Sequence, residues 1–212
     1  MLSDLIVIKS SFKENKIKSL LFVSFFLSFQ IQASTVLFLG DSLTEGYQLE
    51  REEAYPALIE KSLKLKHPDL KVINGGSSGA TSAGGMKRLN WYAKTKPDIL
   101  VLALGSNDGL RGMDLKESEK YLSSIIEKAQ SEKKKVLLVG MKMPTNYGEP
   151  YRTNFEKLFP TLAKKYHLPL VPFLLEGIGG VPKLNLADGI HPNQEGHKMM
   201  AKLVQKSLEP LL

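Results

Sequence analysis

Cysteine is absent from this 212-residue chain. Its absence excludes a disulfide framework, a thiolate nucleophile, a thiolate zinc site and a lipid-modified cysteine as a membrane anchor. The chain also lacks the usual nucleotide-binding fingerprints. The glycine-rich stretch NGGSSGATSAGG contains no G-x-G-x-x-G, and it has Gly85 where a P-loop needs lysine. Thiol chemistry and a standard phosphate cradle are therefore not expected.

A concentration of one charge is missing as well. The chain has 29 basic and 22 acidic residues, and the basic residues are scattered along it although the formal net charge is +7. Proteins that bind nucleic acids usually carry a basic stripe or patch, so we predict no nucleic-acid partner. With 42% hydrophobic residues, a chain of this length can bury a sizeable core as one domain.

Residues 1–33 differ from the rest of the chain. Lys13, Lys16 and Lys18 precede the apolar run SLLFVSFFLSF, and QIQAS follows it. This order is typical of a secretory signal peptide, and the run is too short for a comfortable membrane span. We predict cleavage after Ala33, one mature domain over 34–212, and a periplasmic or secreted protein without a stable membrane span; an uncleaved anchor is the alternative.

After residue 34 the chain alternates between two kinds of segment. Stretches with helical periodicity separate five short apolar runs, TVLFLG, LKVIN, DILVLALG, KVLLVG and LPLVPF. Parallel strands need crossover connections, and these stretches supply them as helices. We predict an α/β fold, a three-layer sandwich around a five-stranded parallel sheet. The last helix is expected over 193–208. Pro160 lies inside the helical stretch that precedes this one and is expected to kink or divide it.

Polar or glycine-rich segments follow four of the five predicted strands. They are GDSLTEG, NGGSSGATSAGG, GSNDGLRG and, after the fifth strand, a segment that ends in LADGIHPN. In open α/β sheets, ligands bind beyond the carboxyl ends of the strands. We therefore expect the functional site at this edge of the sheet.

The four segments together hold the groups that acyl transfer to water requires. Ser42 can act as the nucleophile and His191 as its base, while Asp188, three residues earlier, can orient the imidazole. The backbone N–H groups of Ser42 and Gly79 and the side-chain amide of Asn107 can donate to the oxyanion. The sequence thus predicts a serine hydrolase site.

Each feature also has a simpler interpretation. A serine just after a strand is often a helix cap. Asp188, His191 and His197 are residue types that can also bind a metal, but no H-E-x-x-H spacing is present, so we predict no metal and no cofactor. Asp41 and Asp108 are expected to brace their turns. His197 is expected at the surface or partly packed, and four residues are expected to pack helices on the sheet: Trp91, Tyr92, Met199 and Met200.

The blocks GDSLT, the segment around Gly79, GSND and DGIH resemble, in this order, the four blocks of the SGNH (GDSL) hydrolase family. The runs NDGLRG and PTNYGEPY are similar to its periplasmic arylesterase, acyl-thioesterase and lysophospholipase branch. The resemblance covers nearly the whole chain after residue 34. It implies a flavodoxin-like sheet with strand order 2-1-3-4-5, a triad of Ser42, His191 and Asp188, and the three oxyanion donors named above. Ala80, where that branch often has Asp, and Ser106, where it often has Gly or Ala, depart from the pattern without removing a catalytic group.

Apolar residues on the loops beside this edge indicate an acyl groove. The candidates are Leu110, Met143, Tyr147 and Leu186, together with Met113 and Leu184. We predict a small-molecule ester or lipid substrate: short to medium acyl esters and aryl esters, with lysophospholipids or acyl thioesters as further substrates. A carbohydrate O-deacetylase on the same scaffold and a non-catalytic flavodoxin-like binding protein are the alternatives. The sequence does not determine the oligomeric state.

Overall fold

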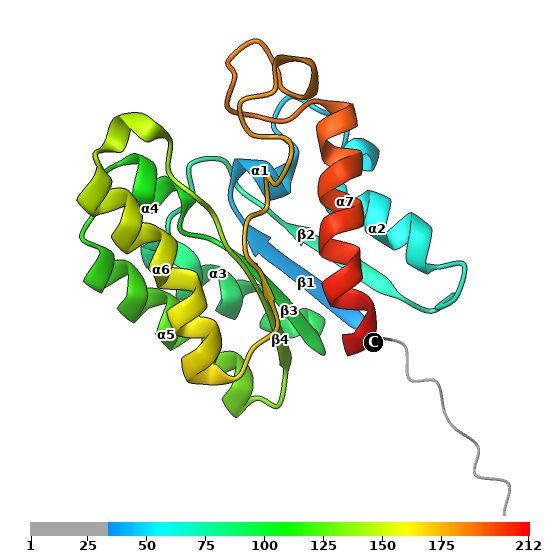
Figure 1. The fold of residues 1–212 in the computed structure, drawn as a ribbon. Coiled ribbons are helices and arrows are strands. Elements are labelled where there is room, and N and C mark those ends of the chain that lie inside the picture. The colour runs from blue at the N-terminus through cyan, green and yellow to red at the C-terminus, as the bar shows by residue number, and fades with distance from the viewer. Residues whose placement is uncertain (1–33) are drawn as a thin grey trace, which may run out of the picture. The chain divides into compact units, whose positions relative to one another are not determined.

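The computed structural model describes residues 34–212, and the predicted signal peptide lies outside the described residues. A single sheet of five parallel strands runs through this part of the chain, in the order β2-β1-β3-β4-β5 (Figure 1). The strands are β1 (Thr35–Gly40), β2 (Lys71–Gly75), β3 (Ile99–Ala103), β4 (Lys135–Val139) and β5 (Leu170–Val171). Both the predicted α/β class and the strand order are confirmed.

Helices cover both faces of the sheet. On one face lie α2 (Tyr55–Leu63) and α7 (Gln194–Leu208). On the other lie α3 (Gly85–Tyr92), α5 (Leu115–Ser131) and α6 (Glu149–Tyr166) (Figure 1). The short helices α1 (Ser42–Glu45) and α4 (Ser106–Leu110) follow β1 and β3 directly. Six 3-10 turns complete the described part, at Arg51–Glu53, Ser82–Gly84, Ala93–Thr95, Thr145–Tyr147, Pro182–Leu184 and Glu209–Leu211.

The alternation of side chains along each strand supplies two separate cores. In β1, Val36 and Phe38 pack under α2 and α7, whereas Leu37 and Leu39 pack under the three helices of the other face. All four side chains are fully buried. A parallel sheet covered on both faces needs such continuous apolar strands, and this is why the five runs carry so little polar character.

Two local expectations about helices have different outcomes. The last helix begins at Gln194, with Asn193 as its cap, as predicted. Pro160 lies inside α6, and the helix runs on through it to Tyr166 without being divided. Pro160 is exposed, so the backbone bond that proline removes is on the side of the helix where water can replace it.

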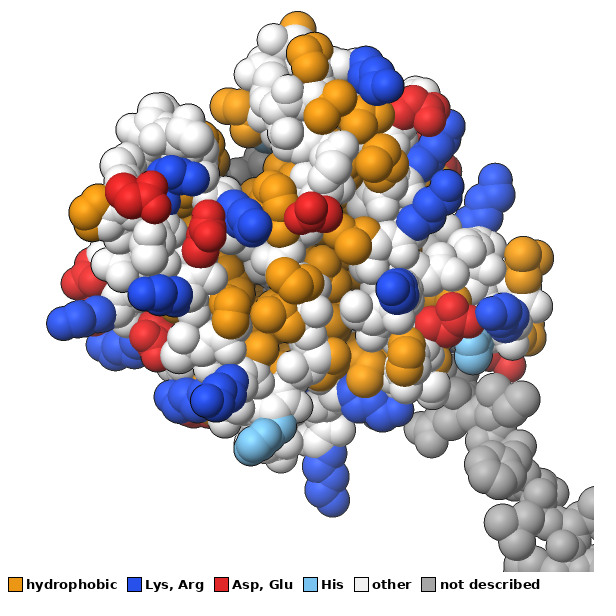
Figure 2. Space-filling view, in the orientation of Figure 1, with side chains coloured by type: hydrophobic (Ala, Val, Ile, Leu, Met, Phe, Trp, Pro, Cys, Tyr) orange, Lys and Arg blue, Asp and Glu red, His pale blue; other side chains and the backbone are white. Residues whose placement is uncertain are grey.

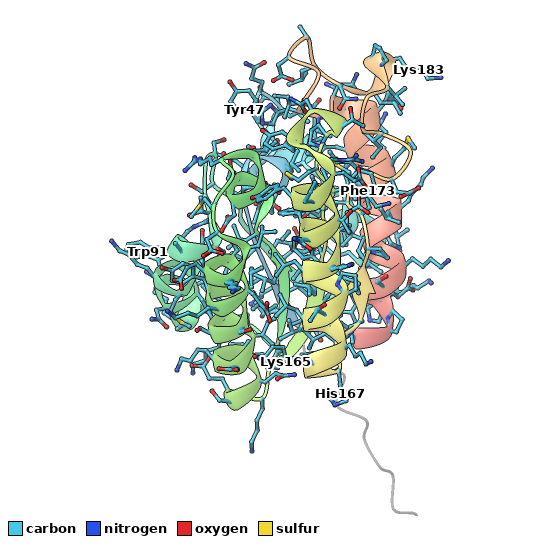
Figure 3. The ribbon with its side chains drawn as sticks, turned by 60° about the vertical axis from the view of Figure 1, so that its left-hand side comes forward. Tyr47, Trp91, Lys165, His167, Phe173 and Lys183 are labelled. Atoms are coloured by element: carbon cyan, nitrogen blue, oxygen red, sulfur yellow. The ribbon has the colours of Figure 1, made fainter. Side chains whose placement is uncertain are left out.

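Trp91 and Met199 do not pack helices onto the sheet, contrary to the prediction. Trp91 is 70% exposed and points away from the domain, with the Lys94 ammonium 5.2 Å from its ring centre (Figure 3). Met199 is 38% exposed, whereas Tyr92 and Met200 pack against the cores as expected. Apolar character alone does not tell which side of a short helix faces the sheet.

The surface carries charges of both signs. On the face drawn in Figure 2, lysine and arginine side chains are interspersed with acidic ones, and hydrophobic side chains gather between α6 and α7. Among residues 34–212, no helix has the length and apolar composition that crossing a membrane requires.

Candidate active site

The chain turns sharply where β1 ends. Asp41 caps α1 by accepting a hydrogen bond from the Leu43 N–H at 3.0 Å, so Ser42 becomes the first residue of that helix. Asp41 is 1% exposed, and its burial raises the pKa of its carboxyl group. A Cβ at Gly40 would lie 2.0 Å from the Thr44 hydroxyl oxygen, so the turn needs glycine there. Asp41 braces the turn, as the sequence predicts.

A chain of hydrogen bonds joins Ser42, His191 and Asp188. The His191 Nε2 atom lies 2.9 Å from the Ser42 Oγ atom, and its Nδ1 atom lies 2.8 Å from Asp188 Oδ2. The other carboxylate oxygen of Asp188 accepts the N–H groups of Ile190 at 2.9 Å and His191 at 3.0 Å. These bonds, the His191 N–H first, lower the pKa of Asp188 to about 2. An ionised Asp188 accepts a hydrogen bond from the His191 Nδ1–H group. This keeps the proton on Nδ1 and leaves Nε2 free to accept the proton of Ser42.

The loop that carries His191 is anchored by a buried amide. Asn185 is 7% exposed, and its side chain donates 2.8 Å hydrogen bonds to the carbonyls of Ile178 and Val181. The Leu186 N–H then donates to the His191 carbonyl at 2.7 Å. Asn185 was not predicted from the sequence, because an asparagine 14 residues after β5 carries no spacing signal of its own.

The predicted oxyanion donors stand on neighbouring segments. Gly79 occupies a tight turn in which the Ala80 N–H donates to the Ser77 carbonyl at 3.0 Å, and its φ of +74° favours glycine. Asn107 lies in α4, and its side-chain amide donates to the Ala80 carbonyl at 3.0 Å. An amide has two N–H bonds, so one of them remains for a ligand. The Ser77 N–H donates to the Gly40 carbonyl at 3.2 Å, which brings the turn to the end of β1.

Asp108 ties three segments together rather than bracing its own turn alone. Its carboxylate accepts the Ser82 N–H at 2.9 Å, the Ser82 hydroxyl, and the Ser118 hydroxyl at 3.1 Å. The side chain is fully buried. Asp108 thereby fixes the loop after β2 to α4 and α5.

Tyr47 is a site residue that sequence reasoning missed. Its ring centre lies 4.4 Å from that of His191, with an angle of 36° between the planes. Tyr47 also borders a cavity of about 570 Å³ whose lining is mostly polar: Glu45, Gly46, Tyr47, Gln48, Leu49, Arg51, Asn74, Gly76 and Ser78. Figure 3 shows Tyr47 beside the loops at the carboxyl edge of the sheet. An aromatic five residues after the serine has no periodicity that would have revealed this contact.

The candidate groove residues are placed unequally. Leu110 is partly buried, and the Tyr147 hydroxyl donates to its carbonyl at 2.8 Å. Leu186 is also partly buried. Met143, in contrast, is 5% exposed and belongs to the core. Of the two further candidates, Leu184 packs against the core beside α7, and Met113 lines a separate cavity of about 520 Å³ between α5 and α6.

His197 is buried, in contrast to its predicted place at or near the surface. It is 1% exposed, and its Nδ1 atom accepts the Tyr55 N–H at 3.0 Å. Burial lowers its pKa to about 4. In residues 34–212, no group of three or more His, Cys, Asp or Glu side chains is arranged to hold a metal ion.

Comparison with known proteins agrees with this geometry. Residues 38–199 match the GDSL-like Lipase/Acylhydrolase family. Esterase TesA of Pseudomonas aeruginosa is 41% identical over 187 residues, 88% of this chain and 93% of that protein. The Thioesterase 1/protease 1/lysophospholipase L1 of Escherichia coli K12 is 36% identical over 85% of this chain and 86% of its own length. A crystal structure of TesA superimposes with a TM-score of 0.81 at 40% identity, covering 84% of this chain and all of that one. The chain therefore belongs to the GDSL-like lipase/acylhydrolase family, the SGNH hydrolases, and is a carboxylic ester hydrolase.

Proposed function

We propose that Ser42 is the nucleophile of a Ser-His-Asp triad with His191 and Asp188, and that hydrolysis passes through an acyl-enzyme. The observation that carries this proposal is the continuous hydrogen-bonded chain from the Ser42 hydroxyl through both imidazole nitrogens to the carboxylate. This chain supports the proposal, because acyl transfer needs a nucleophile, a base and an orienting acid linked in this order.

The proposed reaction proceeds in two steps, acylation of Ser42 and hydrolysis of the acyl-enzyme. As the Ser42 Oγ atom bonds to the substrate carbonyl carbon, His191 takes the hydroxyl proton, and the carbonyl oxygen becomes an oxyanion. The N–H groups of Ser42 and Gly79 and the Asn107 amide donate to that oxyanion. Collapse of the intermediate breaks the ester bond, and His191 protonates the departing alcohol or thiol. Water then repeats the sequence on the acyl-enzyme, which releases the acid and restores Ser42.

The surroundings of the triad suit an ester with two unlike ends. Leu110, Tyr147 and Leu186 offer apolar surface on the segments that follow β3, β4 and β5, and we assign the acyl chain to that side. The 570 Å³ cavity beside Tyr47 contains Arg51, Asn74 and Ser78 in its wall, and this polar lining suits the leaving group. Met143 is too buried to contribute much surface. Short to medium acyl esters and aryl esters are the proposed substrates, with lysophospholipids and acyl thioesters as further ones.

A serine-reactive fluorophosphonate probe tests the nucleophile. Wild-type protein is expected to label at one site and to hydrolyse nitrophenyl esters, whereas Ser42→Ala is expected to lose both properties. Ser124→Ala is the matched control, since Ser124 is an exposed serine on α5 that bonds only to the Lys120 carbonyl. Undiminished ester turnover by Ser42→Ala would contradict the proposal. A series of acyl lengths tests the substrate side, and activity confined to acetylated sugars would instead support the deacetylase alternative.

We also propose that residues 1–33 direct export and are removed after Ala33. The support is the order of basic region, apolar core and small residues in the sequence. The enzyme would then act in the periplasm or outside the cell.

A further inference from the structure

The loop after β2 rests directly on the end of α1. A Cβ built on Gly76 would lie 2.1 Å from the backbone nitrogen of Glu45, so the two backbones are in contact. Next to this contact, the Asn74 side-chain amide group donates to the Glu45 carbonyl at 3.4 Å, and its Oδ1 atom accepts the Gly76 N–H at 2.9 Å. The loop that carries the oxyanion glycine is therefore built against the helix that begins with the nucleophile.

The Glu45 side chain adds a charged bond to this contact. One carboxylate oxygen, Oε2, accepts both the N–H of Ser78, at 2.6 Å, and the Ser78 hydroxyl. Hydrogen bonds to a carboxylate are shorter and roughly twice as strong as neutral ones. Glu45 holds a loop residue 33 positions away in the sequence by two donors at once.

Ser78 immediately precedes Gly79 in the Ser77–Ala80 turn. On the far side of the turn, the Arg111 guanidinium donates to the Gly79 carbonyl at 3.0 Å. Ala80 has no polar side chain to brace the turn from within. The position of the Gly79 N–H thus depends on groups outside the turn, of which Glu45 is the one attached to the helix of Ser42.

We propose that Glu45 is a positioning residue for the oxyanion hole: its carboxylate fixes Ser78 against α1 and so sets the distance between the Gly79 N–H and the carbonyl that Ser42 attacks. The inference rests on the proposed function, in which Gly79 donates to the oxyanion. Although Glu45 also borders the cavity assigned to the leaving group, this role is exerted through Ser78 and not through contact with substrate. An oxyanion donor must lie within about 2.7 to 3.1 Å of its target, so a small shift of the turn is costly.

Replacement of Glu45 by alanine is expected to reduce kcat while KM stays near the wild-type value. A misplaced oxyanion donor is missed mainly in the transition state, where the negative charge develops. A displacement of about 1 Å at a catalytic group can cost about 100-fold, and we expect a loss between about 10-fold and about 100-fold. Fluorophosphonate labelling is expected to slow in parallel, because the phosphoryl oxygen of that probe occupies the same place as the oxyanion.

Three variants of the full chain make the test specific. Glu52→Ala removes an equal charge from an exposed position in the nearby Arg51–Glu53 turn, and it should behave as wild type. Glu45→Gln keeps the shape and one acceptor oxygen, so its kcat is expected between those of wild type and Glu45→Ala. Ser78→Ala removes the hydroxyl partner, and its effect should not add fully to that of Glu45→Ala, because both changes break one interaction.

Active-site titration with the probe counts the folded enzyme in each preparation, and kcat is expressed per titrated site. A kcat of Glu45→Ala within about 2-fold of wild type would overturn the inference. So would a rise in KM with kcat unchanged, since Glu45 would then contact substrate from the cavity. These outcomes are separate from a failure of the proposed function, which would appear as undiminished turnover by Ser42→Ala.

Discussion

Asp188 shows how a short spacing in the sequence fixes the orientation of a carboxylate. One of its oxygens is occupied by two backbone N–H groups of its own loop, and the other faces the His191 ring. The carboxylate cannot rotate away without losing those bonds. Because its pKa is lowered to about 2, Asp188 stays ionised over the neutral and mildly acidic range. Loss of activity on mild acidification must therefore come from another group than Asp188.

The ring of Tyr47 covers His191, and its removal is expected to reduce turnover. Aromatic pairs contribute about 0.5 to 1.5 kcal/mol, so Tyr47→Ala should lower kcat by about 2-fold to 13-fold as the imidazole gains freedom. Tyr47→Phe keeps the ring and should retain most of the activity. Steady-state kinetics on one nitrophenyl ester measure both variants. Equal losses in Phe and Ala variants would show that the hydroxyl group, not the ring, is what matters.

Between elements, His197 joins two helices of one face. Located on α7, it accepts the N–H of Tyr55, the first residue of α2, where no earlier helical carbonyl is available. The Tyr55 hydroxyl in turn lies 3.0 Å from that of Thr44 in α1. Two buried hydrogen bonds of Tyr55 therefore connect the helix after His191 with the helix that begins at Ser42. The bond to Tyr55 requires an unprotonated Nδ1 atom.

This requirement predicts a pH dependence of stability. The pKa of His197 is about 4 in the folded protein, below its ordinary 6.5, so the unfolded chain binds more protons between these values. The contribution of His197 is fully present above about pH 6.5 and is lost as the pH falls toward 4. Urea unfolding of wild type should show this decline, and His197→Asn should show less of it.

Asparagine keeps a side-chain oxygen that can accept the Tyr55 N–H, whereas His197→Leu removes the acceptor and is expected to be less stable at pH 7. A buried N–H of Tyr55 without an acceptor costs about 1 to 3 kcal/mol of unfolding free energy. His167→Asn is the control, because His167 is exposed and has a φ of +53°, a conformation that asparagine tolerates. An unchanged slope between pH 6.5 and 4 in His197→Asn would contradict the assignment of this window to His197.

For the molecule as a whole, the parallel sheet explains why the site is assembled from distant segments. All strands point the same way, so the loops after β1, β2, β3 and β5 emerge at one edge (Figure 1). Crossover connections through the helices carry the chain back each time. One rigid scaffold thereby brings together Ser42 and His191, the proposed nucleophile and base, which are 149 residues apart in the sequence.

Export is the prediction that concerns the entire chain. When the full-length gene product is made in a bacterial host, the protein is expected in the periplasmic or secreted fraction with Ser34 as its first residue. N-terminal sequencing and fractionation measure both properties. A variant in which Lys13, Lys16 and Lys18 are replaced by Glu should remain largely unprocessed, since the basic region before the apolar run would be lost. An intact N-terminus on exported wild-type protein would instead indicate an uncleaved anchor.

A feature of this protein can be predicted from the sequence where it depends on residues that are close together in the chain. Five apolar runs and the intervening helical periodicity determine the α/β class, since burial on both faces and crossover connections allow few other arrangements. The blocks around Ser42, Gly79 and Asn107 and the Asp188-to-His191 spacing indicate the chemistry because each block is short and self-contained. Helix burial was less predictable: Trp91 points outward and His197 inward, contrary to expectation.

Only the tertiary structure decided the contacts between segments far apart in the chain. Three such contacts depend on which loops the sheet brings together: the ring contact of Tyr47 with His191, the hydrogen bond from Tyr55 to His197, and the hydrogen bonds from Ser78 to Glu45. The identity of an exposed glutamate or tyrosine carries no periodic signal, so these roles are absent from the sequence pattern. The sequence by itself determined which chemical groups are present and in what order. Folding of the parallel sheet decided which of them meet, because the strand order sets which loops become neighbours.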